Sequence, residues 1–356
     1  MIHTLEEAIN WASQASNAGC SSIAWDTEKK EPLWGRNFDF HIWISGTKGL
    51  FIPRHYSYYL EGDALENNIN EETKQTTTYA MTGVGTAISN STPVLFDGIN
   101  EKGLMGGLLY FTQYARYASN DHDNTLPIQP AFVVTHVLAQ CQTIDDVEKL
   151  ILNDVTIVND PLFQHLFELH YIFSDANGET AIVECDEHGV HVYRHTMGIM
   201  TNSPDYPWQK AHLYPYKNIS NHPDQPFTIN GETLQPFSQG FNGHSLPGDW
   251  SSASRFVRAS FLKEFGIKGK DETEGVMNLF RLFYNLAYPK GMVYPTPDTP
   301  EYTLYTAIGC ATSLNYYVNT YQSNTIQVLP LAEWKDETEL KEIELVQQPH
   351  FIKAEV

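Results

Sequence analysis

The sequence predicts a single layered domain of the α+β class, and three observations carry that prediction. Strand-like segments dominate 20–111, helical patterns follow them, and strands return before the C-terminus. No linker-like composition separates these blocks after Cys20, and no internal repeat or low-complexity tract interrupts them. Because blocks of strands and helices in this order pack as layers around one core, we expect one domain over 20–356. Residues 1–19 then form an N-terminal extension.

The extension is expected to be a short amphipathic helix over 3–19. Thr4 followed by Glu7 is a capping-box pattern, and Gly19 ends the helix. After it, the segments CSSIAW and LWGRNFDF are typical of strands on either side of a charged turn at 28–32. Further strand-like runs cover 50–59, 76–83 and 93–111, the last of them folded at a turn over 100–103.

Helical periodicity appears in the middle of the chain. Val134, Val137, Leu138 and Cys141 recur at the spacing of one helix face, so we expect Cys141 to be a buried structural thiol. A second helix over 143–153 is expected to begin at a Thr143 cap. The remaining expected elements are strands at 170–175 and 180–184, helices at 253–265 and 274–288, and strands within 302–331.

A segment rich in Pro, Asn and Gly covers 209–245 and shows little periodicity. Irregular segments of this length inside a compact domain usually serve function or assembly. We therefore interpret it as an assembly arm.

The composition excludes several classes of protein. With 22 Lys and Arg against 43 Asp and Glu, the formal net charge is −21, which disfavours binding to nucleic acid or to anionic membranes. No apolar run is long enough to span a bilayer, and the N-terminus lacks the pattern of a secretory signal. The four cysteines are dispersed without metal-ligand spacing. Free thiols suit a reducing compartment, so we expect a cytoplasmic protein with no metal and no cofactor.

The candidate nucleophile is Cys20. The sequence contains no GxSxG, HExxH, P-loop or strand-linked GxGxxG motif. Cys20 follows Gly19 and begins the first strand, and Arg36 and Asp39 come soon after. If the bond before Cys20 were cut, its α-amine, with an ordinary pKa near 7.7–8.0, could serve as base for its own thiol. Arg36 would favour the thiolate and Asp39 would orient the ammonium form.

Five sequence blocks then resemble, in order and spacing, the motifs of the choloylglycine hydrolase family, which includes bile salt hydrolases and penicillin V acylases. The resemblance covers Cys20 to about Leu331. The blocks are Cys20-Ser21-Ser22, Gly35–Asp39, Asp97–Leu104, Thr201–Pro204, and Leu246–Asp249 with Ser254–Phe256.

The resemblance implies the four-layer αββα sandwich of N-terminal-nucleophile hydrolases and an amide-hydrolysing site without metal or cofactor. By position, Cys20 matches the nucleophile, and Arg36 and Asp39 match the charged pair beside it. Asn202 matches the side-chain donor of an oxyanion hole, and Tyr110 matches the residue whose backbone N–H completes that hole. Arg255 matches an arginine that braces the site.

The implied substrate is a small hydrophobic amide. An aromatic residue at Tyr110 resembles the penicillin V acylase branch, since bile salt hydrolases more often carry Asn there. Tyr110 and Ile42 would then line an apolar acyl pocket. In that branch the arm joins subunits, which implies a homotetramer.

Three alternatives remain open from the sequence. The substrate could be a conjugated bile salt or an acyl-homoserine lactone instead. The chain could also be a non-catalytic binding or assembly protein with a blocked cysteine. Residues 1–19 match neither a secretion signal nor the few residues that processed family members usually lose, so they are interpreted as a propeptide.

Overall fold

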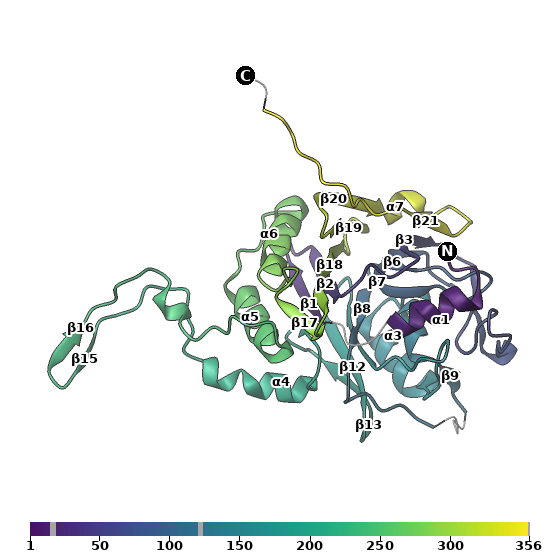
Figure 1. Ribbon diagram of the computed structural model, residues 1–356, viewed down its shortest axis with the longest axis horizontal. Helices are drawn as coiled ribbons and strands as arrows, with labels where there is room; N and C mark the ends of the chain where they lie inside the picture. The colour runs from purple at the N-terminus through teal and green to yellow at the C-terminus, as the bar shows by residue number, and fades with distance from the viewer. Residues whose placement is uncertain (15–18, 120–123, 355–356) are drawn as a thin grey trace.

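The computed structural model describes residues 1–14, 19–119 and 124–354, and it folds as four layers (Figure 1). Two β-sheets face each other in the centre, with α5 (Ser252–Phe265) and α6 (Glu272–Tyr284) on one outer side. On the other outer side lie α2 (Val133–Gln140) and α3 (Ile144–Lys149). This is the αββα sandwich of N-terminal-nucleophile hydrolases, as the sequence predicted.

The first sheet carries the candidate nucleophile on β1, next to the short edge strand β14. Its order is β14-β1-β2-β18-β19-β20, with β17 paired to β18. Its strands are β1 (Cys20–Asp26), β2 (Pro32–Phe40), β14 (Ile199–Met200), β17 (Val293–Thr296), β18 (Thr299–Cys310), β19 (Asn315–Thr320) and β20 (Ser323–Pro330).

The second sheet has eight strands in the order β13-β12-β11-β8-β7-β6-β3-β21. They are β3 (Thr47–Ile52), β6 (Met81–Thr86), β7 (Val94–Asn100), β8 (Met105–Tyr110), β11 (Leu169–Ser174), β12 (Thr180–Asp186), β13 (Gly189–Arg194) and β21 (Lys341–Ile343). Strands β6, β7, β8 and β11 are buried along their whole length, because a sheet in a four-layer fold is covered on both faces.

Strand register brings distant parts of the sequence to the same place. The β1–β2 hairpin sets Cys20 opposite Phe38, and β18 sets Thr303 opposite Asp39. The residues after β14 follow β1 closely, since β14 pairs with it at Ser22. The start of β1 therefore lies close to segments from three other regions of the chain.

The predicted N-terminal helix is present and begins at Leu5. Helix α1 runs from Leu5 to Gln14, and the rest of the predicted 3–19 helix, residues 15–18, lies outside the described residues. The capping box is confirmed: Glu7 N–H donates to Thr4 Oγ1 at 3.2 Å, and Thr4 N–H donates to the Glu7 carboxylate at the same distance. The helix packs through Ala8, Trp11 and Ala12, which are buried.

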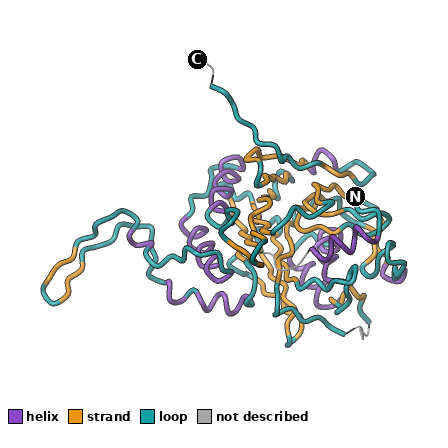
Figure 2. Tube along the Cα trace, in the orientation of Figure 1, coloured by secondary structure: helices purple, strands orange, loops and turns teal. Residues whose placement is uncertain are grey.

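The predicted arm projects from the body of the molecule (Figures 1 and 2). Its tip is a small hairpin of β15 (Phe227–Ile229) and β16 (Glu232–Leu234), exposed along its whole length. The prediction of an arm beginning at 209 was wrong at its start, because helix α4 (Tyr206–His212) continues through that position. Asp205 caps this helix by accepting from Trp208 N–H, and Pro207 suits its first turn.

The other helix predictions hold with shifted ends. Thr143 forms a full capping box for α3, as expected. Helix α6 stops at Tyr284 rather than at 288, because the backbone turns there towards the strands that follow. The short elements that remain are β4 (Ser57–Tyr59), β5 (Lys74–Thr76), β9 (Leu126–Ile128), β10 (Val155–Ile157) and α7 (Leu331–Trp334). Among the helices of the described residues, none is long and apolar enough to cross a membrane.

Candidate active site

Cys20 begins β1 and is fully buried. Its backbone N–H donates to Asn202 Oδ1 at 2.8 Å. Its sulfur lies 2.6 Å from Arg36 Nη2, which donates to it. The structure therefore brings Cys20, Arg36 and Asn202 together, although they lie up to 182 positions apart in the chain.

Arg36 is held rigidly behind the sulfur. Its Nη1 donates to the carbonyl oxygens of Phe96 and Leu108 at 3.1 and 2.7 Å, and it lies 3.3 Å from the Asp97 carboxylate. Burial would lower the pKa of this guanidinium, but Cys20, Tyr305 and Asp97 raise it above its ordinary value. The guanidinium is thus a fixed positive charge beside the thiol.

Asp97 was missed as a site residue by sequence reasoning. It is fully buried, and Tyr305 and Tyr316 both donate their hydroxyls to its carboxylate. Asp97 therefore balances the positive charge of Arg36 and fixes the orientation of its guanidinium. Groups behind the metal ligands of metalloproteins orient those ligands in the same way. The available signal was its place at the head of the Asp97–Leu104 block, a charged residue in an otherwise apolar strand.

Asp39 lies at the same end of β2. Thr303 donates its hydroxyl to one carboxylate oxygen, while the other, Oδ2, finds no hydrogen-bond partner within the described part of the chain. Burial raises the pKa of Asp39 to about 6, and Arg255 and Thr303 only partly oppose it. Leaving a buried carboxylate oxygen without a hydrogen-bond partner costs free energy. Asp39 Oδ2 can therefore accept a hydrogen bond from a cationic donor placed near it.

Asn202 follows β14 and connects three parts of the site. Its Nδ2 donates to the carbonyl oxygen of Tyr110 at 3.0 Å, and its backbone N–H donates to Ser252 Oγ at 2.9 Å. The two residues expected to form the oxyanion hole, Asn202 and Tyr110, thus lie in contact beside Cys20. The hydroxyl of Ser252, at the start of α5, fixes the Asn202 backbone.

Arg255 projects from α5 into the same cluster. Its guanidinium donates to the carbonyl oxygen of Cys20, to Ser21 Oγ at 2.9 Å and to Asn202 Oδ1 at 2.7 Å. Its Nε donates to the Trp250 carbonyl at 3.0 Å. Arg255 therefore fixes the backbone of the nucleophile and the orientation of the Asn202 amide at once.

The thiol of Cys20 is held neutral in this structure. Burial raises its pKa to about 11, with Arg36 opposing that rise and Asp39 adding to it. The thiolate is the reactive form of a cysteine. With Gly19 attached, only a small fraction of Cys20 is therefore thiolate near neutral pH.

A small apolar cavity lies between the N-terminal helix and Phe38, the strand partner of Cys20. Trp11 and Tyr110 face the same apolar cavity, in which only about 20 Å³ remains empty, room for about one water. The other residues around the cavity are Phe38, Ile44, Val94, Phe96, Leu108, Ala131, Phe167 and Leu169. Ile42, predicted to line the acyl pocket, is 41% exposed and does not line this cavity, because β2 ends at Phe40 and the strand alternation stops. Ile44 lines it.

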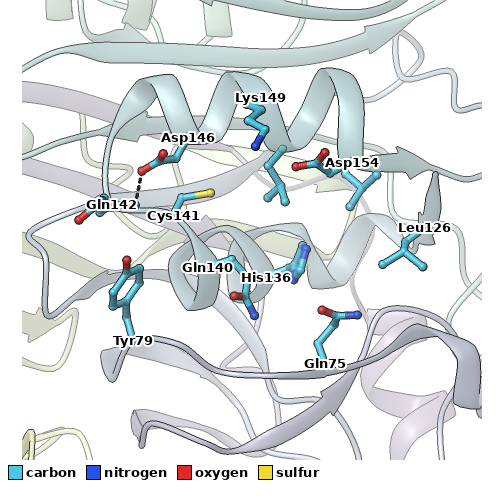
Figure 3. A pocket seen from close by; sticks show the side chains of 12 residues that line it. Gln75, Tyr79, Leu126, His136, Gln140, Cys141, Gln142, Asp146, Lys149 and Asp154 are labelled. Atoms are coloured by element: carbon cyan, nitrogen blue, oxygen red, sulfur yellow. Dashed lines mark hydrogen bonds between the residues drawn. The ribbon is translucent and has the colours of Figure 1, made fainter. Parts of the chain in front are cut away.

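A second cavity, of about 360 Å³, lies away from Cys20 beside α2 and α3 (Figure 3). Cys141 and His136 both line it, yet burial raises the pKa of Cys141 well above its ordinary value and lowers the pKa of His136 to about 4. His136 Nδ1 is engaged with the Tyr58 hydroxyl at 2.7 Å. This arrangement supports the interpretation of Cys141 as a structural thiol. No cluster of three or more His, Cys, Asp or Glu side chains suited to a metal was found across 1–14, 19–119 and 124–354.

A fold of this type, with a cysteine starting a strand and paired with an arginine and an asparagine amide, defines a linear amide hydrolase. Residues 20–343 match the family described as linear amide C–N hydrolases, choloylglycine hydrolase family. The chain belongs to this family and is a linear amide hydrolase.

Several relatives share most of the chain. The bile salt hydrolase/transferase of Clostridium perfringens is 30% identical over 314 residues, 88% of this chain and 92% of that protein. The bile salt hydrolase/transferase of Lactiplantibacillus plantarum is 31% identical over 324 residues, 90% and 95% of the two chains. The penicillin V acylase of Pectobacterium atrosepticum is 28% identical over 228 residues, 58% and 53%.

Solved structures show the same fold. A variant of the conjugated bile acid hydrolase from Clostridium perfringens superposes with a TM-score of 0.85 at 27% identity, covering 94% of this chain and all of that one. The penicillin V acylase from Agrobacterium tumefaciens superposes with a TM-score of 0.70 at 22% identity, covering 91% and 90%. The latter likeness is one of fold.

Proposed function

We propose that Cys20, once released from residues 1–19, is the N-terminal nucleophile that hydrolyses an acyl amide. The observation that carries this proposal is the polar cluster at the start of β1: the nitrogen, oxygen and sulfur atoms of Cys20 are each bonded by Asn202, Arg255 and Arg36 respectively. A structural core cysteine needs none of these partners.

The reaction follows from those contacts. The α-amine of Cys20 takes the thiol proton, and the sulfur attacks the carbonyl carbon of the substrate amide. Asn202 and the Tyr110 backbone N–H stabilise the oxyanion, a kind of contact worth several kcal/mol in the transition state. The C–N bond then breaks, and the leaving amine takes the proton from the α-ammonium. Water hydrolyses the thioester, which releases the acid and restores the thiol.

Asp39 holds the charged intermediate of this cycle. Its Oδ2 lacks a partner among the described residues, and it lies at the end of β2 beside Cys20. An α-ammonium formed at Cys20 would supply the missing donor. Arg36 stays at the sulfur and favours the thiolate during attack.

A conjugated bile acid is the first candidate substrate. The relatives that match most of this chain are named bile salt hydrolases, and the pocket left by Trp11 is apolar on every wall. A bulky apolar acyl group would be buried there, while the hydrophilic amine part faces solvent.

Penicillin V is the second candidate, and Tyr110 favours it. Its side chain is 6% exposed and lines the cavity, where an aromatic acyl group could stack on it. The identity to a penicillin V acylase covers a smaller part of the chain, which is why it ranks second.

The arm is proposed to join copies of this chain into a homotetramer. Phe227, Ile229 and Leu234 at its tip are 59%, 54% and 41% exposed. A projecting apolar hairpin is a typical element of an oligomer interface. Light scattering on a chain with a shortened arm should give a smaller particle, and an unchanged mass would count against this assignment.

Two measurements test the proposed function. Intact mass should show loss of residues 1–19, which would also separate an enzyme from a binding protein with a blocked cysteine. A panel of glycocholate, taurocholate, penicillin V and acyl-homoserine lactones should then show turnover of one class. Turnover by a chain that keeps residues 1–19 would refute the role of the free α-amine.

A further inference from the structure

Gly19 and Cys20, the residues on either side of the bond to be cut, are hydrogen-bonded at every backbone N–H and C=O group. Gly19 N–H donates to Glu301 Oε1, and the Gly19 carbonyl oxygen accepts from Asp39 N–H at 2.9 Å. On the other side of the bond, Cys20 N–H and the Cys20 carbonyl oxygen are bonded to Asn202 and Arg255. The bond between these residues is thus held on both sides by groups of the site.

Tyr288 closes the space beside the Gly19 Cα. A Cβ built at Gly19 would lie 2.5 Å from Tyr288 Oη and 2.7 Å from its ring carbon Cζ, far inside contact distance. The ring has little freedom to move. Its hydroxyl donates to the Trp250 carbonyl at 3.0 Å, and the Arg255 guanidinium lies 5.2 Å from the ring centre.

Glu301 is the second wall of this space. It belongs to β18, is 5% exposed, and lies among the charged groups of the site near Asp39 and Arg255. Burying a carboxylate is costly unless it is well paired. Its carboxylate accepts from Gly19 N–H and so holds the backbone nitrogen of Gly19, while Asp39 N–H holds the Gly19 carbonyl oxygen.

We propose that Tyr288, Glu301 and the Asp39 backbone N–H form a subsite that selects glycine before Cys20 and positions the Gly19–Cys20 bond for cleavage by Cys20 itself. This inference rests on the proposed function and adds the residues that recognise the leader. Glu301 and Tyr288 are positioning residues, while the Asp39 N–H touches the reacting carbonyl.

The proposed cleavage consumes one water molecule. The Cys20 sulfur attacks the Gly19 carbonyl carbon, and the Asp39 N–H stabilises the resulting oxyanion. The C–N bond breaks, the Cys20 nitrogen takes the thiol proton, and Gly19 is left as a thioester on the sulfur. Water then attacks this thioester, which releases a leader ending in the Gly19 carboxylic acid and restores the thiol. The oxyanion donor of this step differs from Asn202, the donor proposed for substrate hydrolysis.

Substitutions of Gly19 test the subsite cleanly, because Gly19 is absent from the mature protein. Gly19→Ala and Gly19→Val are expected to slow loss of the leader by about 10²-fold, the cost of misplacing a reacting group by about 1 Å. Intact mass over time measures this rate. The mature chains should be chemically identical to wild type and show the same kcat per mature molecule. Glu6→Ala, an exposed change in the same leader, is the control and should mature at the wild-type rate.

A Tyr288→Leu substitution is expected to restore processing in the Gly19→Ala variant. It removes Oη, Cζ and Cε2, the three atoms that a Cβ at Gly19 would meet. Combined with Gly19→Ala, it should restore much of the lost processing rate. Equal processing by Gly19→Val and wild type, or no rescue by Tyr288→Leu, would overturn the selection of glycine.

Glu301 is tested by its conservative and apolar variants. Glu301→Gln keeps an oxygen that can accept from Gly19 N–H and should mature faster than Glu301→Leu, which cannot. Asp63→Asn, another fully buried carboxylate far from Gly19 in sequence, is the matched control for a lost buried charge. Equal rates for Glu301→Leu and wild type would overturn its role. If wild type itself never loses residues 1–19, both this inference and the proposed function fail, whereas normal wild-type processing with unaffected variants sinks this inference alone.

Discussion

Trp11 offers the sharpest test of how the extension controls the site. It is 1% exposed, packs against Phe163 and Phe167 at ring-centroid distances of 6.2 and 5.6 Å, and fills the cavity beside Tyr110. Replacing a buried tryptophan by alanine costs about 3–5 kcal/mol. Trp11 Nε1, however, has no hydrogen-bond partner within 1–14, 19–119 and 124–354, and an unsatisfied buried donor costs about 1–3 kcal/mol.

We therefore expect Trp11→Ala to weaken docking of α1 by about 2–3 kcal/mol, or about 30- to 150-fold. The assay uses a Cys20→Ala chain, in which the leader should stay attached. Hydrogen exchange of the α1 amides should accelerate by that factor, while Leu5→Ala, a 38% exposed residue of the same helix, should change it little.

Vacating the cavity should also let ligands in. In the same Cys20→Ala background, Trp11→Ala should bind small aromatic acids such as phenoxyacetate and phenylacetate, measured by calorimetry, whereas the chain with Trp11 should not. Added indole should compete with these ligands, because it fills the space that the side chain left. Equal ligand binding with and without Trp11, or unchanged exchange in α1, would refute the assignment of this cavity as the acyl pocket.

The remaining predictions address the chemistry. Cys20→Ser should lower amide hydrolysis by orders of magnitude while Cys141→Ala leaves most of it intact, and full activity in Cys20→Ala would exclude the nucleophile. A chelator should not change turnover and a thiol alkylator should abolish it; loss on chelation with recovery by zinc would contradict this. Burial raises the pKa of Glu301 to about 7, so in Cys20→Ala its contribution to the free energy of unfolding should be complete below the ordinary carboxyl pKa and be lost as pH rises through about 7. Glu301→Gln should flatten that fall in urea titrations, and an unaltered pH profile would argue that the carboxyl is not perturbed. Asn202→Ala should lower kcat by about 10²–10³ with a much smaller change in KM, whereas near-normal kcat with normal melting would remove it from the mechanism.

Local sequence signals predicted most of the elements that build this fold. The Thr4 and Thr143 caps were readable because a capping box needs only residues three positions apart, and both are present. The turn at Gly103, with φ of +79°, was readable for the same reason. The predicted start of the arm was wrong because α4 is too short and polar to show a helical periodicity. Its Asp205 cap and its packing define this helix instead.

The residues of the site also differ in whether local sequence or long-range strand pairing brings them together. Cys20, Arg36 and Asp39 lie in one hairpin, and their proximity follows from strand pairing that sequence can indicate. Glu301, Tyr288 and Thr303 come from the far end of the chain, and only the pairing of β18 with β2 brings them beside Gly19. No short motif encodes that register, so sequence reasoning could not find them. Ile42 lies after the end of β2 and is 41% exposed, so its contact with substrate stays a prediction.

The peptide bond between Gly19 and Cys20 affects the Cys20 nitrogen, the Cys20 thiol and the adjoining cavity. While Gly19 is attached, the Cys20 nitrogen is an amide that donates to Asn202, the thiol has a pKa raised to about 11 by burial, and Trp11 occupies the adjoining cavity. Cutting the bond turns that nitrogen into an amine with a pKa near 8 and supplies a cationic donor for Asp39 Oδ2. Release of the extension also removes Trp11, which admits water to the thiol and weakens the burial that raised its pKa. On the proposed mechanism, the base and the acyl pocket become available in that single event, and the thiol that made the cut becomes open to substrate. On this argument, alkylation of Cys20 should need strongly alkaline pH before processing and proceed near neutral pH afterwards; equal pH profiles for the two forms would show that the extension does not control the nucleophile.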